Sequence, residues 1–229
     1  MDKISWIDHQ ELFDLMKKEL FSAVIGDVMD TIGLVHQFLP PAIRPLEKTM
    51  VVAGRAFPVV EADIGTPAID EGLAGKPFGV MLEALDDLRP HEVYICSGAS
   101  PDYALWGEIM TVRARHLGAA GAVVDGYSRD TAGILKTGFP TFSYGAYSQD
   151  QQVRGKVVDY RVPITFGNVR IEPGDIVFGD FDGVCIIPQK HEKEVIEGAL
   201  QKARTEKIVQ KKIIEGMSAC EAFEKYGVI

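Results

Sequence analysis

Residues 105–134, LWGEIMTVRARHLGAAGAVVDGYSRDTAGI, contain the pattern that decides the fold of this chain. Apolar residues in the first half recur at helical spacing and predict an amphipathic helix that ends at Gly118: Ile109, Met110, Val112, Ala114 and Leu117. The next run, residues 121–124, reads as a buried strand, with Asp125-Gly126 as the turn after it. This turn delivers Arg129-Asp130 to the start of a second helix, at the C-terminal edge of a strand, where open α/β folds commonly bind ligands.

The same stretch places a second group of candidate ligands near the first. Gly107-Glu108 begins the predicted helix, so the free backbone N–H groups of Ile109 and Met110 are available to an anion. Twenty residues separate Glu108 from Arg129, enough for one helix and one strand that fold back on each other. Helix N–H groups, an arginine and two acids suit a small carboxylate ligand with a divalent metal. The alternative is that the aspartate after Arg129 only caps its helix, which contributes about 1 kcal/mol.

The spacing Gly-Glu, twenty residues, Arg-Asp, with Gly-x-x-Gly-x-Val-x-Asp-Gly leading into it, resembles the RraA-like superfamily. More narrowly, it resembles the class II 4-hydroxy-4-methyl-2-oxoglutarate / 4-carboxy-4-hydroxy-2-oxoadipate aldolases. The resemblance covers most of the chain, from DVMDTIGL near residue 27 to the terminal helix. It implies an α/β fold of the swivelling β/β/α type, with a mixed sheet, a β meander and a C-terminal helix. It also implies a homotrimer or homohexamer with sites between subunits.

The activity implied by the resemblance is that of a lyase. It releases pyruvate from 4-hydroxy-2-oxo dicarboxylic acids through an enolate, with oxaloacetate decarboxylation as a side activity. Such a cleavage needs an electron sink, and because the central motif contains no lysine, a divalent metal is favoured over a Schiff base. We expect Asp130 to hold Mg²⁺, or Mn²⁺, with water completing the coordination.

The remaining roles follow from the same resemblance. Arg129 is expected to stabilise the developing enolate oxygen. The substrate carboxylate is expected to bind at the helix start, at Gly107, Ile109 and Met110, and also to contact Arg129. Glu108 is expected to orient the waters of the metal. Glu206 matches an acid that the terminal helix of a neighbouring subunit supplies in the aldolases.

Two alternatives stay open beside this enzyme. One is a protein-binding regulator of ribonuclease E without catalysis, as in the founding members of the superfamily. Those regulators generally lack the acid after the arginine, so Asp130 favours the enzyme. The other, demethylmenaquinone methyltransferase, is a name often given to such chains, but no Gly-rich nucleotide-binding motif supports it. The chain also has Tyr127 and Ser128 where these aldolases commonly have a small residue and a valine, so we expect an altered pocket.

Net charge, motif spacing and hydropathy argue against several other functions and predict the compartment. The 33 acidic and 24 basic residues give a net charge of −9, which disfavours sequence-independent nucleic-acid binding. The five histidines show no metal-binding spacing, and Gly-x-Ser-x-Gly is absent. No apolar run approaches the length of a membrane span. Three widely spaced cysteines without a signal peptide predict reduced thiols and a cytoplasmic protein: Cys96, Cys185 and Cys220.

Along the chain we expect one RraA-like domain over residues 1–229, with residues 190–229 as a C-terminal helical extension. Helices are predicted over 8–20, from a capping Ser22 to Gly33, and over 78–90. Strands are predicted over 50–60, with Gly54 as a possible bulge, and over 93–96, with a loop over 63–76. Alternating strands and helices over 78–145 predict a partly parallel sheet. Short apolar runs from residue 153, with turns at 173–175 and 182–183, resemble a meander packed on that sheet.

Overall fold

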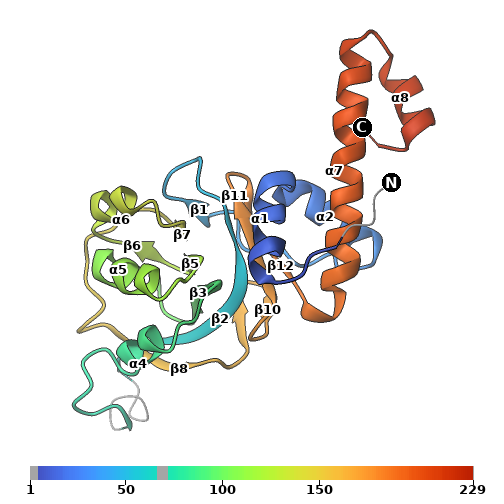
Figure 1. Ribbon diagram of the computed structural model, residues 1–229. Helices are drawn as coiled ribbons and strands as arrows, with labels where there is room; N and C mark the ends of the chain where they lie inside the picture. Colours follow the sequence, from blue (N-terminus) through green and yellow to red (C-terminus); the bar gives the residue numbers. More distant parts are fainter. Residues whose placement is uncertain (1–4, 66–71, 229) are drawn as a thin grey trace.

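A curved mixed sheet forms the centre of the protein (Figure 1). The computed structural model describes residues 5–65 and 72–228, so the middle of the loop predicted over 63–76 lies outside the described residues. Within that part of the chain, the path of the sheet runs through β1 (Arg44–Pro45), β7 (Thr141–Ser143), β5 (Gly121–Val124), β3 (Glu92–Ser97), β2 (Val52–Asp63), β11 (Ile176–Asp180) and β12 (Gly183–Ile187), while β8 (Gly155–Tyr160) also pairs with β2. Strands β2, β3, β5 and β7 are parallel, as the alternation of strands and helices predicted.

The two ends of this sheet approach each other. Leu39 N, in the segment before β1, donates a hydrogen bond of 2.9 Å to Val184 O of β12, and the Arg44 guanidinium donates to Asp182 O in the turn before that strand. The sheet is therefore nearly closed, and its inner face buries one hydrophobic cluster. The hairpin of β9 (Ile164–Phe166) and β10 (Val169–Ile171) contributes side chains to the same cluster.

Helices cover the two outer sides of the sheet (Figure 1). On one side, α1 (His9–Glu19), α2 (Ser22–Thr31) and α7 (Glu192–Ile214) bury a cluster against β11 and β12. On the other side, α4 (Met81–Asp86), α5 (Glu108–His116) and α6 (Thr131–Thr137) bury a cluster against β2, β3 and β5. A short parallel pair, β4 (Ala104–Trp106) with β6 (Tyr127–Ser128), leads into α5 and α6. The starts of these two helices therefore lie side by side.

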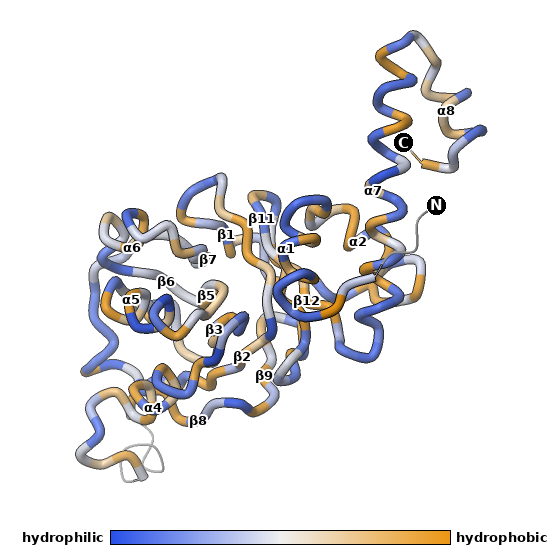
Figure 2. The backbone as a smooth tube through the Cα atoms, in the orientation of Figure 1, coloured by the Kyte–Doolittle hydropathy of each residue, from blue (hydrophilic) through white to orange (hydrophobic). Residues whose placement is uncertain are grey.

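The C-terminal segment is helical, as predicted. A single 3-10 turn, η1 (Gln189–His191), leads into α7, whose last turns extend beyond the body of the protein, and α8 (Ala219–Tyr226) folds back beside them (Figures 1 and 2). Apolar and polar residues alternate along this outer part of α7 (Figure 2). None of the helices in the described part of the chain is both long and apolar enough to cross a membrane.

Two predictions about local structure are wrong. Ser22 does not cap α2, because it is the first residue of that helix and its hydroxyl donates a 2.7 Å hydrogen bond to Asp180 Oδ1 of β11. The irregularity of β2 occurs between Val60 and Glu61, not at Gly54, which pairs in regular register with Val177 of β11. Gly54 is instead a site of close packing, since a Cβ there would come within 2.5 Å of a backbone oxygen.

The predicted buried face of α5 is only partly right. Ala114 is buried, and Met110 and Leu117 pack against the hydrophobic cluster on this side of the sheet. Ile109 is 84% exposed and Val112 is 55% exposed, however, and the polar Thr111 is buried instead. The helix is turned this way because Thr111 Oγ1 accepts a 2.7 Å hydrogen bond from the buried Trp106 indole. The strands after residue 153 differ from the expectation as well, because β8 and β11 pair with β2 itself and so extend the first sheet instead of packing on it.

Candidate active site

Arg129 and Asp130 connect β6 to α6. The Arg129 N–H donates a 2.8 Å hydrogen bond to Trp106 O, which ties this junction to the end of β4. Asp130 is the N-cap of α6 in a left-handed conformation (φ 57°, ψ 31°), and its side chain makes no capping hydrogen bond. A left-handed residue other than glycine costs on the order of 1 kcal/mol. The interpretation of Asp130 as a simple helix cap is therefore wrong, and its carboxylate is left for another partner.

The N-terminus of α5 lies directly beside this carboxylate. Gly107 is the N-cap of α5, and no side chain caps that end, so the first N–H groups of the helix are open to a ligand. A Cβ on Gly107 would lie 3.1 Å from Asp130 Oδ2 and 3.6 Å from Arg129 Cγ. Glycine therefore permits the close approach of the two helix starts that the sequence predicted.

A cavity of about 220 Å³ opens at this point, roughly the volume of seven water molecules in the liquid. Of the residues predicted for the site, it is lined by Gly107, Ile109, Met110, Arg129 and Asp130. Its other walls come from α4 and the turn before it, from β4, and from the segment after β7. The size fits a small organic acid.

Asp150 and Gln151 line the same cavity, and sequence analysis missed them. Asp150 Oδ1 lies 3.2 Å from Arg129 Nη1, and Asp130 Oδ2 lies 3.8 Å from Arg129 Nε, so one guanidinium sits between two carboxylates. Asp150 belongs to an irregular segment of polar residues, SQDQQ, with no periodicity. The segment packs beside β4, where Ala104 N donates a hydrogen bond to Gln149 O. This tertiary contact places Asp150 at the site.

Behind Gln151 lies a buried carboxyl group. The Gln151 side-chain amide donates a 2.6 Å hydrogen bond to Glu61 Oε2 of β2, and both residues are buried. Burial raises the pKa of Glu61 to about 8, against the lowering effect of hydrogen bonds from Gln151 and Cys96. Glu61 is therefore protonated at neutral pH and holds a residue of the cavity wall from within the core.

The model of the family described as RraA-like: Aldolase/RraA matches residues 22–186. The chain belongs to this family. A provisionally named 4-hydroxy-4-methyl-2-oxoglutarate aldolase of Halalkalibacterium halodurans is 30% identical over 87% of both chains. Protein DlpA of Legionella pneumophila is 28% identical over 90% of this chain, which spans only 32% of the length of DlpA.

Solved structures show the same RraA-like fold. An uncharacterized protein from Pseudomonas syringae pv. tomato superposes with a TM-score of 0.83 at 25% identity, over 99% of both chains. Streptomyces coelicolor RraAS2, described as an unusual member of the RNase ES inhibitor RraA protein family, gives a TM-score of 0.76 at 22% identity. It covers 91% of this chain and 99% of its own. The predicted RraA-like α/β fold is thus confirmed.

Glu108 and Glu206 are not among the residues that line the cavity of this RraA-like chain. The Glu108 side chain lies over α6, where a Cβ on Gly133 would come within 2.5 Å of both its carboxylate oxygens. Glu206 lies on α7, on the other side of the sheet. Burial raises the pKa of Glu206, while the charge of Lys202 lowers it and that of Asp27 raises it. Its predicted role in a neighbouring subunit stays a prediction.

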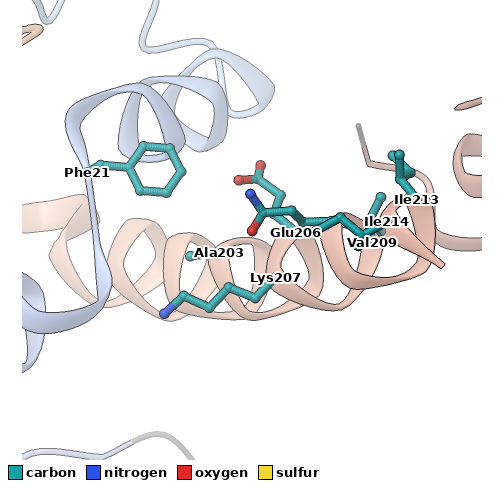
Figure 3. A pocket seen from close by; sticks show the side chains of 8 residues that line it. Phe21, Ala203, Glu206, Lys207, Val209, Ile213 and Ile214 are labelled. Carbon is teal, nitrogen blue, oxygen red and sulfur yellow. The ribbon is translucent and has the colours of Figure 1, made fainter.

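Glu206 lines a second and larger hollow of about 550 Å³, between α7 and the residue that precedes α2 (Figure 3). This groove is mostly apolar: its walls include Phe21, Val209, Ile213 and Ile214, with Glu206 and Lys207 as its charged residues. Its described lining residues include no arginine, and its single acid lies beside its single lysine along α7. The cavity at Arg129 is therefore the better candidate for chemistry on an anionic substrate.

Tyr127 and Ser128, which depart from the aldolase pattern of the family, do not line the cavity either. Ser128 is fully buried, and its hydroxyl lies 3.2 Å from Ser143 Oγ. Tyr127 makes edge-on contacts with the rings of Tyr144 and Tyr147. Neither side chain therefore contacts the cavity directly, and their predicted effect on the pocket stays a prediction.

The site has the oxygen donors that a hard divalent cation needs, though not a complete cage. The described residues contain no group of three histidine, cysteine or acidic side chains arranged to hold a metal. Asp130 and Asp150, on either side of Arg129, give the lining an excess of negative charge. Mg²⁺ often binds through one or two carboxylates and keeps several waters. The residues present therefore fit a cation held by Asp130 with water, and the predicted metal stays a prediction.

Proposed function

We propose that this protein is a divalent-metal-dependent aldolase that cleaves 4-hydroxy-2-oxo acids to pyruvate. One observation carries the proposal: the Asp130 carboxylate, at a strained N-cap position where it caps nothing, faces the same small cavity as Arg129 and the open start of α5. Backbone strain that has no structural use is typical of functional sites. The family and the provisional name of the Halalkalibacterium halodurans relative agree with an aldolase.

The residues of the cavity have distinct roles in this reaction. Asp130 and waters would hold Mg²⁺ or Mn²⁺, and the bound cation supplies a Lewis acid for the negative charge that develops on the 2-oxo group. The N–H groups of Ile109 and Met110 bind the C1 carboxylate. Arg129 donates hydrogen bonds to the C2 oxygen as it becomes an enolate, and Asp150 keeps the guanidinium in place.

Cleavage of the C3–C4 bond also needs two proton transfers. The proton of the C4 hydroxyl leaves to a base, the C4 carbonyl product departs, and C3 of the pyruvate enolate takes up a proton. We propose that Glu108, beside α6, accepts the hydroxyl proton through a water. Glu206 of a neighbouring subunit in a homotrimer or homohexamer is the second candidate for this proton. Decarboxylation of oxaloacetate forms the same enolate and is expected as a side activity.

The proposal is tested by pyruvate release from 4-hydroxy-4-methyl-2-oxoglutarate and from oxaloacetate, with MgCl₂ or MnCl₂ and with EDTA. We expect turnover that EDTA abolishes and added cation restores. Asp130→Asn, which retains the ability to adopt a left-handed conformation, should reduce kcat/KM by at least about 100-fold. The matched control is Asp30→Asn, an exposed aspartate on α2 on the other side of the sheet. Equal loss in both variants, or full activity in Asp130→Asn, would contradict the assignment.

The alternative function, regulation of ribonuclease E by protein binding, has a separate test. A protein that releases no pyruvate with either cation and inhibits cleavage of a ribonuclease E substrate would support that alternative. The sequence argument against it is Asp130, the acid after the arginine that those regulators generally lack.

A further inference from the structure

The cavity at Arg129 is divided into a polar end and an apolar end. The polar groups lie at the open start of α5, at the junction of β6 with α6 and on the segment after β7: the first backbone N–H groups of α5, Arg129, Asp130, Asp150 and Gln151. The apolar wall comes from α4, the turn before it, and the facing side of α5: Phe78, Met81, Leu82, Leu85, Ile109 and Met110. A substrate whose carboxylate binds the polar end therefore directs its far end toward hydrocarbon.

The charged residues of the lining also favour an uncharged group at the apolar end of the cavity. Among the described residues that line the cavity, Arg129 is the only cation, and two aspartates already flank it. The apolar wall carries no charged side chain and no unpartnered polar side chain to receive a second anion. Placing a carboxylate against hydrocarbon without a partner is costly, whereas an alkyl group gains about 25 cal/mol for each Å² removed from water.

We infer that the preferred substrate carries an uncharged, apolar substituent on C4, and so is a 4-hydroxy-2-oxo monocarboxylic acid. This inference rests on the proposed aldolase function and narrows its substrate class. It differs from the dicarboxylic acid that the sequence resemblance implied. The reaction is a balanced retro-aldol cleavage: the C3–C4 bond breaks, the C4 hydroxyl loses its proton, C3 gains one, and the products are pyruvate and an aliphatic ketone or aldehyde.

Two substrates that differ in one group test the inference. 4-Hydroxy-4-methyl-2-oxoglutarate carries a carboxylate on C4, and 4-hydroxy-4,5-dimethyl-2-oxohexanoate carries an isopropyl group of similar shape there. We expect kcat/KM for the alkyl compound to exceed that for the dicarboxylate by at least about tenfold. A preference for the dicarboxylate would overturn the inference and leave the proposed aldolase function intact.

Binding supplies a readout that does not depend on turnover. 2-Oxoglutarate and 5-methyl-2-oxohexanoate have no C4 hydroxyl and cannot undergo the cleavage. Calorimetry on the full chain, without metal and with MgCl₂, is expected to show tighter binding of the alkyl acid by at least about tenfold in both conditions. If neither hydroxy acid releases pyruvate, the aldolase proposal fails. Separately, if the alkyl acid binds no more tightly than 2-oxoglutarate, the inference about the apolar wall is overturned.

A charge placed on the wall should reverse the preference. Leu82 on α4 is 56% exposed, so Leu82→Arg is expected to fold. The new cation should raise kcat/KM for the dicarboxylate and lower it for the alkyl acid, by about tenfold each. Leu135→Arg on α6, also exposed and outside the cavity, is the matched control and should change neither value. If Leu82→Arg alters the mass measured by light scattering and leaves selectivity unchanged, the wall is a subunit contact and the inference is wrong.

Discussion

The side-chain amide of Gln151 donates a 2.6 Å hydrogen bond to Oε2 of Glu61, ninety residues away in the sequence, inside the protein. Gln151 lines the cavity and Glu61 does not, so a buried acid supports the wall of the candidate site from behind. The second oxygen of Glu61 has no hydrogen-bond partner among the described residues. A proton on this group removes the charge that burial makes costly.

The stability of the protein should therefore fall as the pH rises. The pKa of Glu61 is raised from 4.5 to about 8, so between these values the folded protein keeps a proton that the unfolded chain has released. This group favours folding most at low pH, and its contribution is lost progressively up to about pH 8, by roughly 3 to 5 kcal/mol in total. Urea denaturation at pH 5.5, 7.0 and 8.5 should show the free energy of unfolding falling with pH in the wild type. In Glu61→Gln it should depend less on pH. Equal slopes would contradict the assignment.

Substitutions of Asp130 should separate backbone strain from chemistry. Asp130 is left-handed at φ 57°, a conformation that glycine adopts readily. In urea denaturation, the free energy of unfolding of Asp130→Gly should therefore lie within about 1 kcal/mol of the wild-type value. Asp130→Ala should be less stable than Asp130→Gly by roughly 1 kcal/mol. Both should lose pyruvate release, since both lack the carboxylate. If Asp130→Gly released pyruvate at the wild-type rate and only the less stable Asp130→Ala lost activity, the backbone conformation would matter and the carboxylate would not.

Asp150 is expected to act through Arg129. Its carboxylate lies 3.2 Å from Arg129 Nη1, and both side chains are partly exposed, so its effect should appear in kinetics more than in stability. Asp150→Asn should lower kcat/KM for pyruvate release by about 10-fold to 100-fold, because the guanidinium loses its support. Asp182→Asn, in the exposed turn between β11 and β12, provides the matched control. A change in the urea midpoint without a change in kcat/KM would place Asp150 in a structural role only.

Gly133→Ala tests Glu108 without altering a charged residue. A Cβ at position 133 would lie 2.1 Å from the Glu108 carboxyl carbon, so that side chain must move away from α6. Alanine also favours the helix by up to about 1 kcal/mol, so we expect a higher melting temperature together with a several-fold lower kcat. In a Glu108→Gln background the same substitution should have no further effect on kcat. Additive losses would mean that Gly133→Ala disturbs the site by another route.

Part of the candidate site was predictable because its signals are local. Gly107, Arg129 and Asp130 lie next to the start of a helix or the end of a strand, and short patterns of glycine, apolar and acidic residues mark such boundaries. Periodicity was less informative about burial. It identified the helix and its buried Ala114, but it also assigned Ile109 and Val112 to the interior, where Thr111 lies instead because its hydroxyl binds the buried Trp106 indole.

From the sequence, local propensities predicted an α/β domain, the order of its main helices and strands, and the pairing of Arg129-Asp130 with the start of α5. The RraA-like form of that α/β fold came from the resemblance to the superfamily, which the motif around these residues carries. Tertiary structure alone decided that Asp150 holds Arg129, that Glu61 supports Gln151, and that α4 gives the cavity an apolar wall. The physical reason is that these contacts join segments far apart in the chain, and no local pattern records which of them meet when the sheet closes.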